Sequence, residues 1–187
     1  MRNSIKKVIS ACVAAVTVLS MSLTVFAADY STSPSYTPST TGTSTVEVIS
    51  SESVSSTSSE ATVNVDSLSR VTVTASALKN VAKNDVELTI VAKRATLSID
   101  PSTVKKVGKL DLSSKISNSA KSSRIKFRSK KDFGCEVKVT LTGCKMSAER
   151  LAKAHVYCNG QDLGPVELNE DGVPVITVTK GGTYEIK

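Results

Sequence analysis

The sequence lacks the residue types on which most catalytic sites and many sugar-binding surfaces depend. It has no tryptophan and a single histidine, His155, and aromatic residues make up only 4% of its 187 positions. Exposed aromatic rings supply much of the contact area at binding surfaces, so stacking on a neutral sugar is disfavoured. With one histidine, the commonest general base is available at a single place. These absences favour a binding module or a structural module over an enzyme.

Cysteine is scarce as well, and its spacing matches no metal motif. Of the four cysteines, Cys12 lies in the N-terminal apolar segment and Cys135, Cys144 and Cys158 lie further along. Because no C-x-x-C pair occurs, zinc is poorly supported, and we expect no metal and no cofactor. One disulfide could form in any of three pairings of Cys135, Cys144 and Cys158, and three free thiols are the alternative. Our candidate is Cys144 with Cys158, because Cys144 follows a glycine in a predicted loop that can adapt its geometry.

A thiol enzyme is the catalytic alternative that the composition leaves. Cys158 follows His155 by three positions in a predicted strand. Side chains three apart on a strand point to opposite faces, so these two would not meet directly. We therefore expect that the protein is not an enzyme, and keep a secreted hydrolase or thiol enzyme using Cys158 or His155 as the rival hypothesis.

Long apolar runs are absent beyond the N-terminus. There, a short basic segment precedes the apolar residues 8–26, and Val25-Phe26-Ala27 offers small residues for cleavage after Ala27. The pattern resembles signal peptides of Gram-positive bacteria, with an uncleaved anchor as the alternative. No later run approaches the roughly 20 residues that a membrane helix needs. We predict that residues 1–27 are a signal peptide and that the protein is secreted or extracellular, either free or associated with the cell wall.

Basic residues are missing from residues 28–60, where 19 of the 33 positions are Ser or Thr. Such a segment cannot bury enough apolar surface to offset the entropy lost on ordering. We predict a disordered Ser/Thr-rich linker, or stalk, over this range. The short apolar alternation in residues 45–50 is not counted as a strand.

Apolar alternation dominates the remaining residues, 61–187, whose length suits one domain with a single core. Asn159-Gly160 is the strongest hairpin signal, and residues 169–172 (Asn-Glu-Asp-Gly) predict a turn rather than a calcium loop, whose spaced acids they lack. Helix starts are predicted at Ser76, Asp100 and Ser147, with Gly108 ending the second helix. About ten short strands predict a mainly β fold: an antiparallel β-sandwich or a barrel-like domain with two or three short helices.

Acidic residues are nearly absent from residues 105–131, which hold ten Lys and Arg against one acid, Asp111. Within this range, the stretch RIKFRSKK places four cations at every second position. They are Arg124, Lys126, Arg128 and Lys130. On a strand they would form one stripe. We predict that the stripe binds an anionic cell-wall polymer, because a basic patch concentrates polyanions near it. The alternative is the solvated face of a strand, whose lysines discourage aggregation.

Other partners are surface proteins, while nucleic acid is a poor candidate for an exported protein. The oligomeric state is left open by the sequence. A purely structural or adhesin-like spacer, with no ligand at all, is the alternative to a binding module.

A resemblance to known proteins rests on two stretches. The run VTVTASALKNVAKNDVELTIVAKRATLSIDPSTVKKVGKLDLS resembles a strand–helix–hairpin unit of extracellular β-rich modules in secreted and cell-surface proteins of Firmicutes. The closing GVPVITVTKGGTYEI resembles the last two strands of many such modules. The resemblance implies an extracellular β-rich module of largely unassigned function, and it carries over no catalytic residue.

Overall fold

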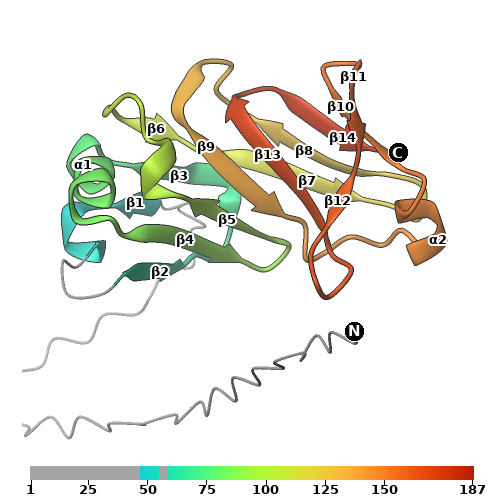
Figure 1. The fold of residues 1–187 in the computed structure, drawn as a ribbon, viewed down its shortest axis with the longest axis horizontal. Coiled ribbons are helices and arrows are strands. Elements are labelled where there is room, and N and C mark those ends of the chain that lie inside the picture. The colour runs from blue at the N-terminus through green and yellow to red at the C-terminus, as the bar shows by residue number, and fades with distance from the viewer. Residues whose placement is uncertain (1–46, 55–58) are drawn as a thin grey trace, which may run out of the picture. The chain divides into compact units, whose positions relative to one another are not determined.

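The computed structural model describes residues 47–54 and 59–187, all of which belong to one compact unit (Figure 1). In these two ranges, the chain forms fourteen strands in three sheets, two α-helices and three 3-10 turns. The prediction of a mainly β fold is confirmed. No sheet closes on itself in these ranges, so the barrel-like alternative is not formed. The predicted signal peptide and most of the predicted linker lie outside the described residues.

The largest sheet has six strands in the order β12-β13-β9-β5-β4-β2. Their bounds are Glu167–Leu168 (β12), Pro174–Lys180 (β13), Asp132–Thr140 (β9), Ala95–Ile99 (β5), Glu87–Ala92 (β4) and Glu60–Asn64 (β2). Neighbours pair antiparallel, except that β2 and β4 are parallel. Ile90, Leu97, Val139 and Ile176 align across four strands and are all buried. This row is the buried face that the alternation predicts.

The second sheet has five antiparallel strands in the order β11-β10-β14-β8-β7. Their bounds are Gln161–Pro165 (β11), His155–Cys158 (β10), Thr183–Ile186 (β14), Ser123–Phe127 (β8) and Ser114–Asn118 (β7). The predicted hairpin at Asn159-Gly160 joins β10 to β11, and both turn residues have positive φ, 50° and 92°. These angles suit the two-residue turns that connect twisted strands.

The third sheet corrects the prediction for residues 45–50. Its order is β1-β3-β6, with bounds Glu47–Ile49 (β1), Val71–Val73 (β3) and Leu110–Asp111 (β6). β1 lies inside the predicted linker, yet it pairs parallel with β3, and Ile49 and Val54 are buried. The pairing of β1 and the burial of these two apolar residues decide the local structure, which the Ser/Thr-rich composition does not predict.

The cap of the longer helix, α1 (Ala75–Asn84), lies two residues before the predicted cap. The side chain of Thr74 accepts a hydrogen bond from the backbone N–H of Ala77 at 3.2 Å, so Thr74 rather than Ser76 caps the helix. Its buried face holds Ala77, Leu78 and Val81. The second helix, α2 (Ala148–Leu151), follows Ser147 as predicted.

The segment after Asp100 forms only a single turn. The Asp100 carboxylate accepts from the N–H of Ser102 at 2.8 Å and caps the 3-10 turn Pro101–Thr103, but no helix continues to Gly108. Instead, the backbone N–H groups of Lys105 and Lys106 donate to the carbonyl of Gly134 on β9. This tertiary anchor replaces the intrahelical bonds that the capping pattern alone would predict. The other 3-10 turns are Ser51–Ser53 (η1) and Leu68–Arg70 (η2).

One apolar cluster joins the three sheets and α1 into a common core. Figure 1 shows β9 and β13 of the six-stranded sheet in front of β7, β8 and β14 of the five-stranded sheet. β7 is an edge strand of its sheet, and η2 packs beside it. The tight turn between β4 and β5 belongs to the other large sheet. These parts border the cleft described next.

Candidate anion-binding cleft

Strand β8 has the two faces that its alternating sequence predicts. Ile125 and Phe127 are buried, whereas Arg124 and Lys126 are exposed. The Phe127 ring packs edge-on against Phe133 and Tyr184, with centroid separations of 5.3 and 6.2 Å. The aromatic residues near the cationic stretch therefore serve the core.

The four predicted stripe residues are exposed but do not share one environment. β8 ends at Phe127, and beyond it the N–H of Arg128 donates to the carbonyl of Ser113 at 2.8 Å. Lys130 lies in the connection to β9. At the other end of β8, Arg124 forms an ion pair of 2.7 Å with Glu185 on β14. Arg124 therefore has an acidic partner, whereas Arg128 has none among the described residues.

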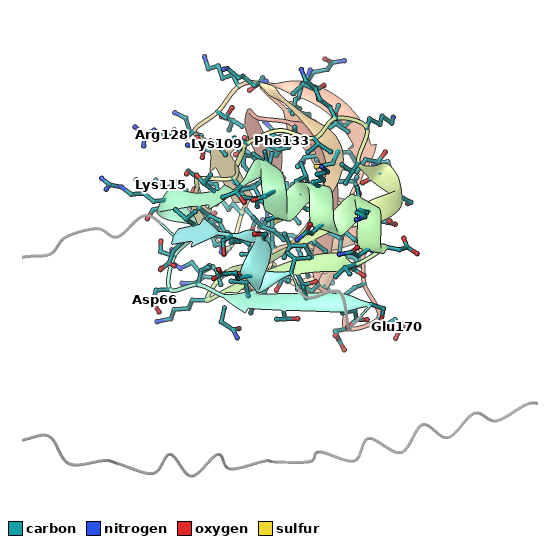
Figure 2. All side chains as sticks on the ribbon, turned by 90° about the vertical axis from the view of Figure 1, so that its left-hand side faces the viewer. Asp66, Lys109, Lys115, Arg128, Phe133 and Glu170 are labelled. Carbon is teal, nitrogen blue, oxygen red and sulfur yellow. The ribbon has the colours of Figure 1, made fainter. Side chains whose placement is uncertain are left out.

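A cleft of about 780 Å³ gathers the last three stripe residues with cations that are distant in sequence. It is bordered by η2, the β4–β5 turn, β7, and β8 with its continuation. Its cationic lining comprises Lys93, Arg94, Lys115, Lys126, Arg128 and Lys130. Among the described residues, its acidic lining is Asp66 alone. Figure 2 shows Lys115 and Arg128 projecting from the same side of the molecule, with Asp66 lower on that side.

The apolar lining of the cleft comes from residues of the core and its margin. Leu68 and Phe127 are at most 4% exposed, and Ala92 and Ile116 are partly buried against the core cluster. The cleft thus combines apolar lining with cationic side chains. A cavity of this size and character is typical of small-ligand sites, in which apolar contact supplies area and a few polar groups fix orientation.

None of the six cations that line the cleft has a carboxylate within ion-pair distance in the described ranges. Like charges gathered beside a low-dielectric wall repel one another and focus a positive potential on the space between them. An anion in that space relieves the repulsion. The cleft is therefore electrostatically suited to negatively charged groups.

Lys93 and Arg94 are members of this site that the sequence does not predict. The two residues form the β4–β5 turn, a place where exposed charge is ordinary. The sequence shows two adjacent cations at the tip of a hairpin, but it does not indicate which other part of the protein they lie beside. Only the packing of the two large sheets brings this turn to the cleft that β7 and β8 also line.

The cysteines are free thiols in the described residues, and the Cys144–Cys158 disulfide is not formed. Cys144 accepts a hydrogen bond from the Ser123 hydroxyl at 3.1 Å, whereas Cys158 is buried on β10. Cys135 is also buried, on β9. Burial, together with nearby Asp132, raises the pKa of its thiol to about 11, which keeps it protonated and unreactive near neutral pH.

His155 and Cys158 lie apart, as the strand geometry predicts. His155 is partly exposed on β10, and its Nδ1 lies 2.8 Å from the Asp162 carboxylate on β11. The N–H of Gly164 donates to the same carboxylate, and this bond, followed by the one from His155, lowers the pKa of Asp162 below its ordinary value. The arrangement holds the β10–β11 hairpin and places no nucleophile beside the histidine.

The turn predicted at residues 169–172 is confirmed. The Asn169 side chain accepts from the N–H groups of Asp171 and Val173, and Gly172 has a φ of 73°. Across residues 47–54 and 59–187, no three His, Cys, Asp or Glu side chains gather in a metal-binding arrangement. In the same ranges, no helix is both long and apolar enough to cross a membrane.

Comparison with known proteins gives no relative from which a role could be transferred. No family model, curated protein or solved structure matches the chain. The cleft is therefore the feature on which a functional argument has to rest.

Proposed function

We propose that the protein is a secreted, non-enzymatic module that associates with the cell envelope by binding an anionic wall polymer in the cationic cleft. The observation that carries this proposal is the convergence of six cations, from both large sheets, on one cleft in which none of them forms an ion pair with a described carboxylate. Residues 124–130 form part of this surface rather than the whole of it.

Three sequence features support the extracellular part of the proposal. They are the signal-peptide pattern in residues 1–27, the Ser/Thr-rich segment that follows it, and the likeness to Firmicutes surface modules. For the fold, we propose a sandwich-like pairing of the two large sheets, which would give the cleft two rigid walls. A polymer lying between such walls would meet a site that needs little rearrangement on binding.

The main rival is a spacer module in which the cleft binds nothing. Surface strands carry lysine for solubility alone, so exposure of Lys126 or Lys115 does not by itself argue for a ligand. The two hypotheses differ in what happens when equal charge is removed inside and outside the cleft. No observation favours the thiol-enzyme alternative, since Cys158 is buried and His155 is engaged with Asp162.

The test is co-sedimentation of the purified protein with isolated Gram-positive cell walls across a salt series. One variant carries Lys115→Ser and Arg128→Ser, in the cleft. The matched control carries Arg124→Ser and Lys138→Ser, which removes the same charge from exposed positions outside the cleft lining.

Wild type and control should bind at low salt and dissociate as the salt concentration rises. Binding of the protein releases counter-ions from the polyanion, and this release becomes less favourable when the solution already contains much salt. The cleft variant should bind about a hundredfold more weakly, because each lost hydrogen bond to a charged group contributes about 1.5–3 kcal/mol. Equal weakening in both variants would make the interaction a matter of net charge. Absence of binding by wild type at every salt concentration would favour the spacer.

A further inference from the structure

Two adjacent serines on the wall of the cleft differ in how their hydroxyls are satisfied. Ser113 and Ser114 are both buried, each 6% exposed, and both line the cleft. The Ser113 hydroxyl donates to the carbonyl of Val71 at 3.3 Å and accepts from the N–H of the same residue at 3.2 Å. The Ser114 hydroxyl has no hydrogen-bond partner in the described part of the chain.

An unsatisfied buried hydroxyl is unfavourable for the folded protein. Burial of such a group without a partner costs about 1–3 kcal/mol, and native proteins contain few of them. Alanine would fill nearly the same space at this position without that cost. The hydroxyl of Ser114 therefore has no explanation in the internal contacts of the fold.

We propose that Ser114 is a specificity-determining residue of the cleft and that the ligand it recognises is a phosphate ester within a wall polymer; this inference rests on the function proposed above. A serine hydroxyl turns about a single bond, so it can swing toward the cleft without a change in the backbone. There it would donate to an anionic oxygen of a ligand in the cleft, whose lining cations form no ion pair in the described residues.

The distribution of the cations favours phosphate over carboxylate. Arg94 reaches the cleft from the six-stranded sheet, whereas Lys115 and Arg128 reach it from the five-stranded sheet and its continuation. A carboxylate is planar and presents its two oxygens on one side. A phosphodiester is tetrahedral and presents its oxygens in several directions, so it can meet donors on different walls at once. The two arginines also present the planar fork that binds phosphate oxygens in pairs.

The apolar lining fits the rest of such a ligand. A phosphate ester carries a carbon skeleton, and the partly exposed side chains of Ala92 and Ile116 offer it contact inside the cleft. A free inorganic anion would leave this surface unused. The combination therefore points to phosphate that is part of a larger organic chain.

The experiment compares three probes by equilibrium binding to the purified protein. They are a soluble poly(glycerol phosphate), polygalacturonate as a carboxylate polymer, and vesicles containing phosphatidylglycerol as a lipid source of phosphate. The phosphate polymer should bind at least tenfold tighter than the carboxylate polymer at equal charge concentration, and vesicles should bind no better than the carboxylate polymer. Equal affinity for the two polymers, or preference for vesicles, would overturn the inference.

Ser114→Ala is compared with Ser117→Ala, an exposed position on the same strand that does not line the cleft. Ser114→Ala should weaken phosphate-polymer binding about tenfold, as expected for loss of a hydrogen bond to a charged group. Its midpoint of thermal unfolding should equal or exceed that of wild type, because the unsatisfied hydroxyl is gone. Ser117→Ala should change neither quantity.

The variants separate this inference from the proposed function. If Ser114→Ala binds like wild type while Lys115→Ser with Arg128→Ser loses binding, Ser114 has no role and the cationic cleft remains the site. If the cleft cations also prove dispensable, the proposed function fails as well. A lower unfolding midpoint for Ser114→Ala would contradict the inference, because it would show that the hydroxyl supports the fold.

Discussion

The two ends of β8 carry the same kind of side chain in different surroundings. At the first end, Arg124 lies 2.7 Å from Glu185 on the neighbouring strand, and its charge is met within the same sheet. At the other end, Lys126 and Arg128 face a cleft that they share with Lys93 and Arg94 of another sheet. Strand periodicity makes these cations equivalent, whereas the packing of the sheets separates them. A cationic stripe is thus a poor unit of function, and the relevant unit is the cleft.

The largest effect that this comparison predicts concerns the fold beneath the cleft. Phe127→Ala removes a ring that is 2% exposed and packs against Phe133 and Tyr184. We expect the free energy of unfolding to fall by about 3–5 kcal/mol, the usual cost of deleting a buried aromatic ring. Denaturant titration measures this loss. Lys126→Ala, the adjacent exposed position, should change stability by no more than about 0.5 kcal/mol.

A small loss for Phe127→Ala would mean that the cleft lining is loosely packed rather than a rigid wall. That outcome would weaken the view that the cleft is preformed. It would leave the cations exposed on a mobile margin of the core, where a fixed arrangement of donors is not expected.

The second effect concerns the β4–β5 turn, the part of the cleft that comes from the six-stranded sheet. Arg94→Gln should lower the affinity for poly(glycerol phosphate) by about as much as Arg128→Gln. Each should reduce the slope of log affinity against log salt by about 0.7–0.9, the value for one counter-ion contact with a nucleic acid. Arg124→Gln is the control and should alter neither value. If only Arg128→Gln weakens binding, the ligand touches one sheet and the two-walled site is wrong.

The sequence predicts much of this molecule, because strand alternation is a local property. The buried faces of β5 and β9, the hairpin at Asn159-Gly160 and the exposed face of β8 follow from residue order alone. The pairing of β1 with β3 does not, since parallel partners distant in sequence leave little local signal. For the same reason the sequence gives no sign that Lys93 and Arg94 face the same space as Arg128.

The Ser114 hydroxyl illustrates another limit. Ser113 and Ser114 are indistinguishable by type and adjacent in sequence, yet one bonds to Val71 and the other has no partner in the described residues. The difference arises because β3 of the three-stranded sheet passes beside Ser113. A sequence pattern does not report such a contact between sheets. It becomes visible only when each buried polar atom is matched to its partners.

The smallest effect is expected at the first end of β8, for the Arg124–Glu185 ion pair. A double-mutant cycle with Arg124→Gln and Glu185→Gln should give a coupling free energy of about 0.2–1 kcal/mol, because the Arg124 side chain is about half exposed and solvent screens the pair. High salt should reduce the coupling further. Glu185→Gln alone leaves Arg124 without its acid, yet poly(glycerol phosphate) affinity should stay within about twofold of wild type, since the freed cation lies outside the cleft and long-range attraction is screened. A marked gain in affinity would show that the polymer reaches this end of β8, and the two ends would then belong to one binding surface.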